Sequence, residues 1–177
     1  AIFGSTGSIG KTIINIIKKD KKNIEIPLLT TNKNYKELLN QIKIFKVKNI
    51  IVTNLEEFQI LKKILSNKKI KIYNNFNCLN KIFGKKKIDY AMNAITGLHG
   101  LEPTMKVIRF TKKIAIANKE TIICGWPLII KELKKHDTDF IPVDSEHFSI
   151  WSLIDKVKNE NIEKIVITAS GGPFNNY

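Results

Sequence analysis

IFGSTGSIGKTIINIIKK, residues 2–19, places a short apolar segment, a glycine-containing loop and a helical pattern one after another. Ile2 and Phe3 are typical of a strand, and Lys11 to Lys18 carries apolar residues at helical spacing. A strand, a glycine loop and a helix in this order are the usual first unit of a sheet that binds nucleotides. This stretch therefore predicts the kind of fold for the segments that follow.

Strand-like and helix-like segments alternate along the rest of the chain. Further strands are predicted at residues 24–30, 49–53, 69–73, 88–95, 113–117, 140–143 and 164–169. Helices are predicted between them at residues 35–45, 55–65, 76–83, 101–110, 120–134 and 146–157. Strands separated by helices predict an α/β fold with a doubly wound parallel sheet, a Rossmann-like domain. Pro27 lies inside the first of these strands and cannot donate a ladder hydrogen bond.

Composition excludes several classes of protein. Cys78 and Cys124 are too few for a disulfide framework, which indicates a reducing compartment. We expect no membrane partner, because no apolar run is long enough to cross a bilayer and no signal-peptide pattern is present. The formal charge of +14 is carried almost entirely by lysine, with Arg109 as the sole arginine. Specific nucleic-acid readers rely on arginine, so we expect no specific nucleic-acid partner.

The loop GSTGSIG has the spacing G-x-x-G-x-x-G over Gly4, Gly7 and Gly10. Gly7 would allow a pyrophosphate to approach the backbone, and the N–H groups of Ser8, Ile9 and Gly10 would point out of a helix N-terminus. Gly10 would permit close packing of the helix on the sheet. The alternative interpretation is a tight turn with a serine N-cap and no ligand.

The end of the second predicted strand reads TTNKN, residues 30–34. Sites that prefer NAD usually place an acid here to bind the ribose 2′-hydroxyl group. This segment has no acid and contains Lys33, whose cation suits a 2′-phosphate. The segment therefore predicts NADP rather than NAD, with an ordinary asparagine-rich turn as the alternative.

Later predicted strands also end in polar or glycine-rich loops. These loops are NAITGLHGLEPT (93–104), ANKETIICG (117–125), PVDSEH (142–147) and TASGGPF (168–174). In PVDSEH, Asp144 and Glu146 lie at the start of a predicted helix, where their carboxylates can converge on one hard cation. The alternative is ordinary helix capping, with Asp144 or Ser145 as the N-cap and an acid in the first turn.

GSTGSIG, ANKE, PVDSEH and SGGPF occur in an order and spacing that resembles the 1-deoxy-D-xylulose 5-phosphate reductoisomerase family. The resemblance runs the full length of the chain and covers about the first half of such an enzyme, so we expect a fragment that is inactive alone. It implies conversion of 1-deoxy-D-xylulose 5-phosphate to 2-C-methyl-D-erythritol 4-phosphate in non-mevalonate isoprenoid biosynthesis. The implied cofactors are NADPH and Mg²⁺ or Mn²⁺. Residues 1–140 would form the NADPH-binding domain, and residues 141–177 the truncated beginning of a catalytic domain.

The resemblance also implies roles for individual residues. The NADPH-binding residues would be Thr6, Gly7, Ser8, Ile9, Asn32, Lys33, Asn34, Asn118 and Glu120. Asp144 and Glu146 would bind the metal, and with Lys119 they would be the catalytic residues. The substrate would contact Lys119, Ser145, Glu146 and Ser170. At position 32 the family commonly has Gly where this chain has Asn32.

The remaining expectations concern the whole protein. The resemblance implies a phosphorylated sugar as substrate, a homodimer at full length, and a location in the bacterial cytoplasm or in a plastid. Two alternatives stay open from the residues. One is another NADP-dependent oxidoreductase without a metal requirement, and the other is a non-catalytic NADP-binding module.

Overall fold

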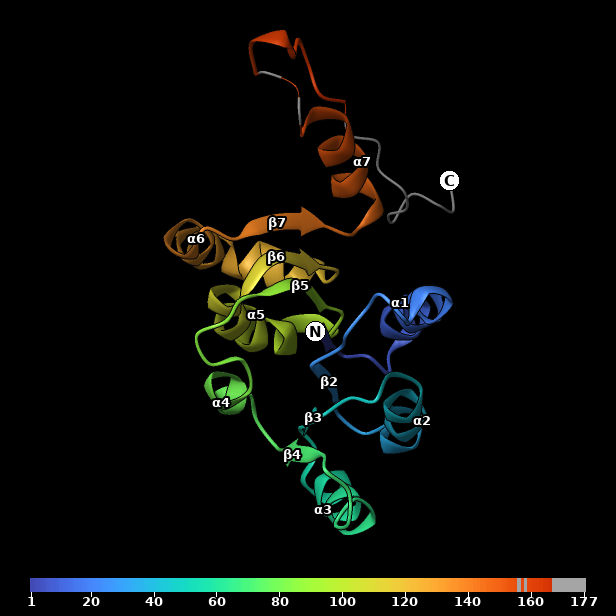
Figure 1. The fold of residues 1–177 in the computed structure, drawn as a ribbon. Helices are drawn as coiled ribbons and strands as arrows, with labels where there is room; N and C mark the ends of the chain where they lie inside the picture. Colours follow the sequence, from blue (N-terminus) through green and yellow to red (C-terminus); the bar gives the residue numbers. More distant parts are fainter. Residues whose placement is uncertain (156, 158, 167–177) are drawn as a thin grey trace, which may run out of the picture.

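The structure is a computed structural model, and it describes residues 1–155, 157 and 159–166. Seven strands form one sheet in the order β4-β3-β2-β1-β5-β6-β7 (Figure 1). The strands are β1 (Ile2–Phe3), β2 (Leu28–Thr31), β3 (Asn49–Val52), β4 (Lys71–Tyr73), β5 (Ile88–Asn93), β6 (Thr111–Ile116) and β7 (Asp139–Pro142). Every neighbouring pair is parallel. The strand order runs outward from β1 in both directions, which confirms the doubly wound α/β fold and places its switch point beside β1.

Helices cover both faces of this sheet. They are α1 (Ser8–Ile17), α2 (Tyr35–Phe45), α3 (Leu55–Ile64), α4 (Leu79–Phe83), α5 (Leu101–Val107), α6 (Lys119–His136) and α7 (Ser145–Ile154). Short 3-10 turns lie at Lys18–Asp20, Phe76–Cys78, Gly97–Gly100, Ile108–Phe110 and Asn159–Asn161. Figure 1 shows α1 and α2 on one side of the sheet, α4, α5 and α6 on the other, and α7 beyond β7.

Two hydrophobic cores result from the alternation of side chains along the strands. Ile2 packs with Leu38 of α2 in one core, whereas the next residue, Phe3, packs with Leu79 of α4 in the other. Successive residues of a strand point to opposite faces, so a run of buried apolar residues serves both helical layers. The near-continuous apolar strands are thus explained by burial on both faces.

The carboxyl ends of four strands lie level with one another. Phe3 of β1 pairs with Asn93 of β5, Asn93 pairs with Ile116 of β6, and Ile116 pairs with Pro142 of β7. The loops that follow these strands therefore leave the sheet at one edge, where ligands of this fold bind.

The predicted elements are largely confirmed, with two corrections. The strand predicted at residues 24–30 begins only at Leu28, because Pro27 has no N–H group to donate to a ladder. Residues 164–166 of the last predicted strand have no strand assignment, and residues 167–169 lie outside the described part. The predicted strand at 140–143 is β7, which pairs with β6 in the same sheet. The domain boundary at residues 140–141 stays a prediction.

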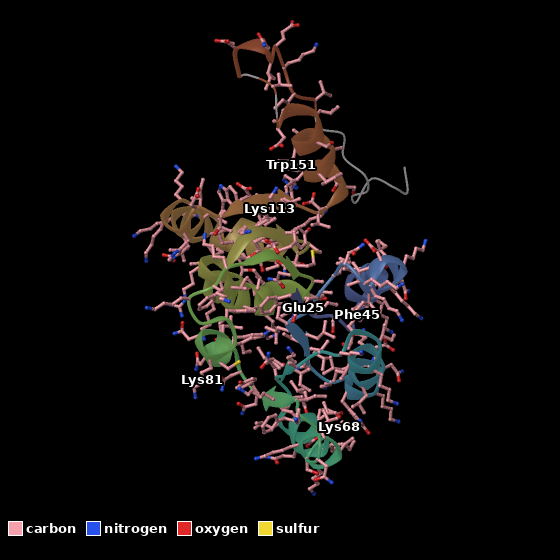
Figure 2. All side chains as sticks on the ribbon, viewed as in Figure 1. Glu25, Phe45, Lys68, Lys81, Lys113 and Trp151 are labelled. Carbon is pink, nitrogen blue, oxygen red and sulfur yellow. The ribbon has the colours of Figure 1, made fainter. Side chains whose placement is uncertain are left out.

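The positive charge is spread over the molecule. Each helix from α1 to α6 carries at least one lysine, and Figure 2 labels Lys68, Lys81 and Lys113 in three separate regions. The absence of a specific nucleic-acid partner stays a prediction. Among the described helices, none is both long and apolar enough to cross a lipid bilayer.

The two cysteines are expected to differ strongly in reactivity. Cys78 is buried, its Sγ lies 3.1 Å from the backbone oxygen of Asn75, and burial raises the pKa of its thiol to about 11. At pH 8 this pKa leaves roughly 100-fold less thiolate than an unperturbed cysteine would have. Cys124 is exposed. A thiol reagent at pH 8 should therefore modify Cys124 rapidly and Cys78 only slowly, as mass spectrometry of timed samples would measure. Equal rates would contradict the described environment of Cys78.

Candidate functional site

A cavity of about 750 Å³ opens at the carboxyl edge of the sheet, beside the switch point. Its walls come from the loop after β1, from residues 30–34 at the end of β2 and from residues 94–96 after β5. Thr53, Phe76, Leu98, His99 and Glu102 complete the lining. The volume and position suit a ligand of nucleotide size.

The glycine loop is held against the end of β2. Gly4 has a φ of +75° and donates from its backbone N–H to Oγ1 of Thr30 at 2.9 Å. The hydroxyl groups of Thr6 and Thr31 lie 2.6 Å apart. These contacts fix the loop on the cavity wall.

The N-terminus of α1 is left open to a ligand. Gly7 is the N-cap and supplies no side-chain cap, so the alternative of a serine N-cap is wrong. The first hydrogen bond of the helix runs from the N–H of Lys11 to the carbonyl oxygen of Gly7 at 2.9 Å. The N–H groups of Ser8, Ile9 and Gly10 precede that bond, as the pyrophosphate hypothesis requires. Ser8 and Ile9 are exposed beside the cavity lining rather than part of it.

Neither the backbone conformation of Gly7 nor a contact within the described protein requires glycine at this position. Its φ is −74°, and an added Cβ would meet the Gly4 carbonyl oxygen at 3.4 Å, which is an acceptable distance. Gly7 nevertheless lines the cavity. The space that a Cβ would occupy is therefore available to a ligand, and this fits a pyrophosphate that approaches the backbone.

The loop after β2 brings a cation to the same cavity. Lys33 lines the cavity, is exposed and has no ion-pair partner among the described residues. Asn32 donates from Nδ2 to Oγ1 of Thr53 at 2.8 Å, and Asn34 caps α2 by accepting from the N–H of Glu37 at 3.1 Å. Both asparagines thus serve the turn, as the alternative interpretation proposed. Lys33 remains available to an anion.

The sequence did not identify several residues of the cavity. The loop at residues 93–104 was placed at the ligand edge, but no role was assigned to Ile95, Thr96, Leu98 or His99. Phe76 follows β4 at the far end of the sheet order, and no local pattern connects it with a nucleotide. Only the fold could have brought it to this cavity.

A polar cluster lies at the start of α6 and α7. Nζ of Lys119 is 3.5 Å from Oε2 of Glu146, and Oγ of Ser145 is 3.3 Å from the same oxygen. The structure therefore brings together three residues that were predicted to bind substrate or metal. Glu120 is exposed in the first turn of α6 and does not line the cavity.

Asp144 combines a helix cap with an unsatisfied oxygen. Its Oδ1 accepts from the N–H of His147 at 3.0 Å and lies 2.6 Å from Nδ1 of the same residue. The Asp144 side chain is only 6% exposed, and its Oδ2 is buried without a hydrogen-bond partner among the described residues. The capping interpretation is thus confirmed for Oδ1 but leaves Oδ2 unexplained. A buried carboxylate oxygen without a partner is costly, and a divalent cation would satisfy it.

The metal interpretation is limited to two carboxylates here. In the part of the chain that the structure describes, no three His, Cys, Asp or Glu side chains gather as metal ligands. Asp144 and Glu146 fit an oxygen-ligated cation that draws further ligands from elsewhere. The predicted substrate residue Ser170 lies outside the described residues.

Comparison with known proteins gives one consistent result. The family model for 1-deoxy-D-xylulose 5-phosphate reductoisomerase matches residues 1–125, and the model for the C-terminal domain of that enzyme matches residues 140–177. The reductoisomerase of Pelagibacter ubique is 64% identical over 177 residues, covering 99% of this chain and 46% of that protein. That of Bacteroides fragilis is 37% identical over 174 residues, 98% of this chain and 45% of that protein. The chain thus spans about half the length of the curated relatives it matches.

Solved structures agree with the sequence comparison. The reductoisomerase of Zymomonas mobilis in complex with NADPH is 31% identical with a TM-score of 0.74, covering 82% of this chain and 38% of that one. A reductoisomerase in complex with NADPH, fosmidomycin and magnesium is 29% identical with a TM-score of 0.77, covering 85% and 37%.

Proposed function

This chain belongs to the 1-deoxy-D-xylulose 5-phosphate reductoisomerase family, and we propose that it forms the NADPH-binding part of such an enzyme. The complete enzyme would convert 1-deoxy-D-xylulose 5-phosphate to 2-C-methyl-D-erythritol 4-phosphate with NADPH and a divalent metal. The observation that carries the proposal is the cavity at the switch point, which shares its edge of the sheet with the cluster at Lys119, Asp144 and Glu146.

The cavity residues support binding of NADPH. Thr6, Gly7, Ser8 and Ile9 would hold the pyrophosphate at the start of α1, where three N–H groups precede the first hydrogen bond of the helix and Gly7 carries no Cβ. Lys33, with Asn32 and Asn34 beside it, would bind the 2′-phosphate. A relative with 31% identity has been solved with NADPH bound. Asn118, the N-cap of α6, and Glu120, in the first turn of α6, would contact the cofactor.

The carboxylate cluster supports a metal and a substrate site. Asp144 would bind the cation through Oδ2, and Glu146 would add a second carboxylate. When bound, the cation would polarise the ketone and hydroxyl oxygens of the substrate. Lys119 and Ser145 would orient substrate oxygens beside Glu146, and Ser170 would complete the contacts from the following segment. A relative with 29% identity has been solved with magnesium.

A direct spectrophotometric assay of the full-length protein tests the proposal. Oxidation of NADPH in the presence of 1-deoxy-D-xylulose 5-phosphate, followed by absorbance, should require Mg²⁺ or Mn²⁺ and should stop on chelation. NADPH binding without turnover would favour the non-catalytic module. Turnover that survives chelation would favour another NADP-dependent oxidoreductase.

The proposal extends to features of the whole protein. We place the end of the NADPH-binding domain near residue 140, because β7 is the last strand of the sheet among the described residues. A homodimer and a cytoplasmic location are proposed from the family, and the two free cysteines agree with a reducing compartment. Size-exclusion chromatography of the full-length protein would test the dimer.

Lys33 should set the preference for NADPH over NADH. Lys33→Ala in the full-length protein removes a charge-assisted hydrogen bond to the 2′-phosphate, and the Kd for NADPH should rise about 10-fold or more. The Kd for NADH should change little, because NADH has no phosphate at that position. Fluorescence titration with each cofactor measures both constants. Lys36→Ala is the matched control, since Lys36 is exposed on α2 outside the cavity. An equal loss of affinity for both cofactors would show that Lys33 does not read the phosphate.

A further inference from the structure

Two buried asparagines hold the backbone of one residue in the cavity wall, Ile95, through its N–H and its carbonyl oxygen. The N–H of Ile95 donates to Oδ1 of Asn93 at 3.1 Å, and the carbonyl oxygen of Ile95 accepts from Nδ2 of Asn118. The two asparagines are 1% and 7% exposed. Ile95 itself lines the cavity. The wall at this point therefore cannot shift without disturbing at least one buried amide.

The same two side chains fix the rest of the loop. Asn93 also donates from Nδ2 to the carbonyl oxygen of Gly100 at 2.8 Å and lies 2.6 Å from Oγ1 of Thr104. A Cβ added to Gly100 would lie 2.0 Å from Nδ2 of Asn118. Because Gly100 has no side chain, the Asn118 amide can occupy this space. The loop is therefore closely packed between the side-chain amides of Asn93 and Asn118.

Asn118 connects this wall to the carboxylate cluster. Its Oδ1 caps α6 by accepting from the N–H of Thr121 at 3.1 Å, while its Nδ2 binds Ile95. The next residue, Lys119, makes the 3.5 Å ion pair with Glu146. A single side chain therefore links the cavity wall to the backbone that positions Lys119.

We infer that Asn118 is a positioning residue that couples occupation of the cavity to metal binding at Asp144 and Glu146. A cofactor packed against Ile95 restrains the backbone of that residue, Asn118 transmits the restraint to the first turn of α6, and the distance of Lys119 from Glu146 is thereby fixed. Coupling of this kind is reciprocal, so each ligand changes the affinity of the other by the same factor. The inference rests on the proposed function, because it takes NADPH and a divalent cation as the two ligands.

The test is the affinity for Mn²⁺ with and without NADPH, measured by calorimetry on the full-length protein without substrate. The ratio of the Kd values for Mn²⁺ with and without saturating NADPH should differ from one by about 5-fold or more. Asn118→Ser should bring this ratio close to one, because serine retains the cap but is too short to reach Ile95. Asn93→Ser, which removes the hydrogen bond to the N–H of Ile95, should also bring the ratio closer to one.

Asn54→Ser is the matched control. Asn54 caps α3 by accepting from the N–H of Glu57 at 3.1 Å and does not line the cavity, so the ratio should stay at its wild-type value. A wild-type ratio of one would overturn the inference, as would a ratio that Asn118→Ser leaves unchanged. If NADPH does not bind the wild-type protein at all, the proposed function itself fails.

Discussion

Replacing Asp144 by asparagine should remove most of the metal-dependent turnover of the full-length protein and leave NADPH binding intact. Asparagine caps helices as well as aspartate does, so the bond from the His147 N–H is retained and α7 should remain folded. The change removes the negative charge from the buried Oδ2, which has no partner in the described protein. We expect kcat at low Mn²⁺ concentration to fall about 100-fold or more. Steady-state kinetics across a metal titration, with an NADPH titration on the same preparation, measure both effects.

Asp139→Asn provides the matched control for Asp144→Asn. Asp139 lies on the same strand–helix unit, is exposed and is 3.8 Å from Lys113, so the same change of charge there should leave kcat within about 2-fold. An Asp144→Asn protein that turns over normally at low metal concentration would show that Asp144 is only a helix cap.

Gly10→Ala and Gly7→Ala should separate folding from cofactor binding. A Cβ at Gly10 would lie 2.3 Å from the Gly4 carbonyl oxygen and 2.6 Å from Cα of Ser5, and these main-chain atoms cannot rotate away. Helix α1 must then move off the loop, at a cost of about 3 kcal/mol in the free energy of unfolding. For a protein of this size that cost lowers the melting temperature by roughly 10 °C.

Gly7→Ala should have the opposite profile. Its Cβ would make only an acceptable 3.4 Å contact inside the protein, so the melting temperature should change little. The methyl group would stand on the cavity side of the loop, and the Kd for NADPH should rise about 10-fold or more. Thermal denaturation and fluorescence titration of both full-length variants measure the two profiles. Wild-type NADPH affinity in Gly7→Ala would place the pyrophosphate elsewhere.

The sequence predicted most of the fold because the strands and helices carry their own signals. Helix α2 begins and ends where its apolar spacing predicts, and the structure adds Asn34 as its cap. The prediction for β2 was less accurate, because Ile24 and Ile26 look strand-like while Pro27 delays the ladder to Leu28. Local apolar pattern cannot separate a buried extended segment from a paired strand.

The candidate site was predictable only where its residues sit in recognisable loops. Lys33 follows directly from its position after the second strand, and the structure places it in the cavity. Asp144 fits both a cap and a metal ligand by sequence, and only its burial shows that one oxygen serves the cap while the other has no partner. His147 contacts Asp144 through its backbone N–H and its ring, and Ile95 contacts two asparagines through its backbone. The residue types alone do not reveal these contacts.

The level ends of β1, β5, β6 and β7 make this site intolerant of changes in strand length. Deleting one residue within β6 would draw Asn118 and Lys119 back by about 3.3 Å and exchange the two faces of the strand. Asn118 would then lose its hydrogen bond to Ile95, and Lys119 would lose its ion pair with Glu146. At the opposite edge of the sheet, Lys85 and Lys86 are exposed in the turn before β5. Tags or fluorophores are therefore best inserted in this turn, at the edge of the sheet opposite the cavity and the carboxylates.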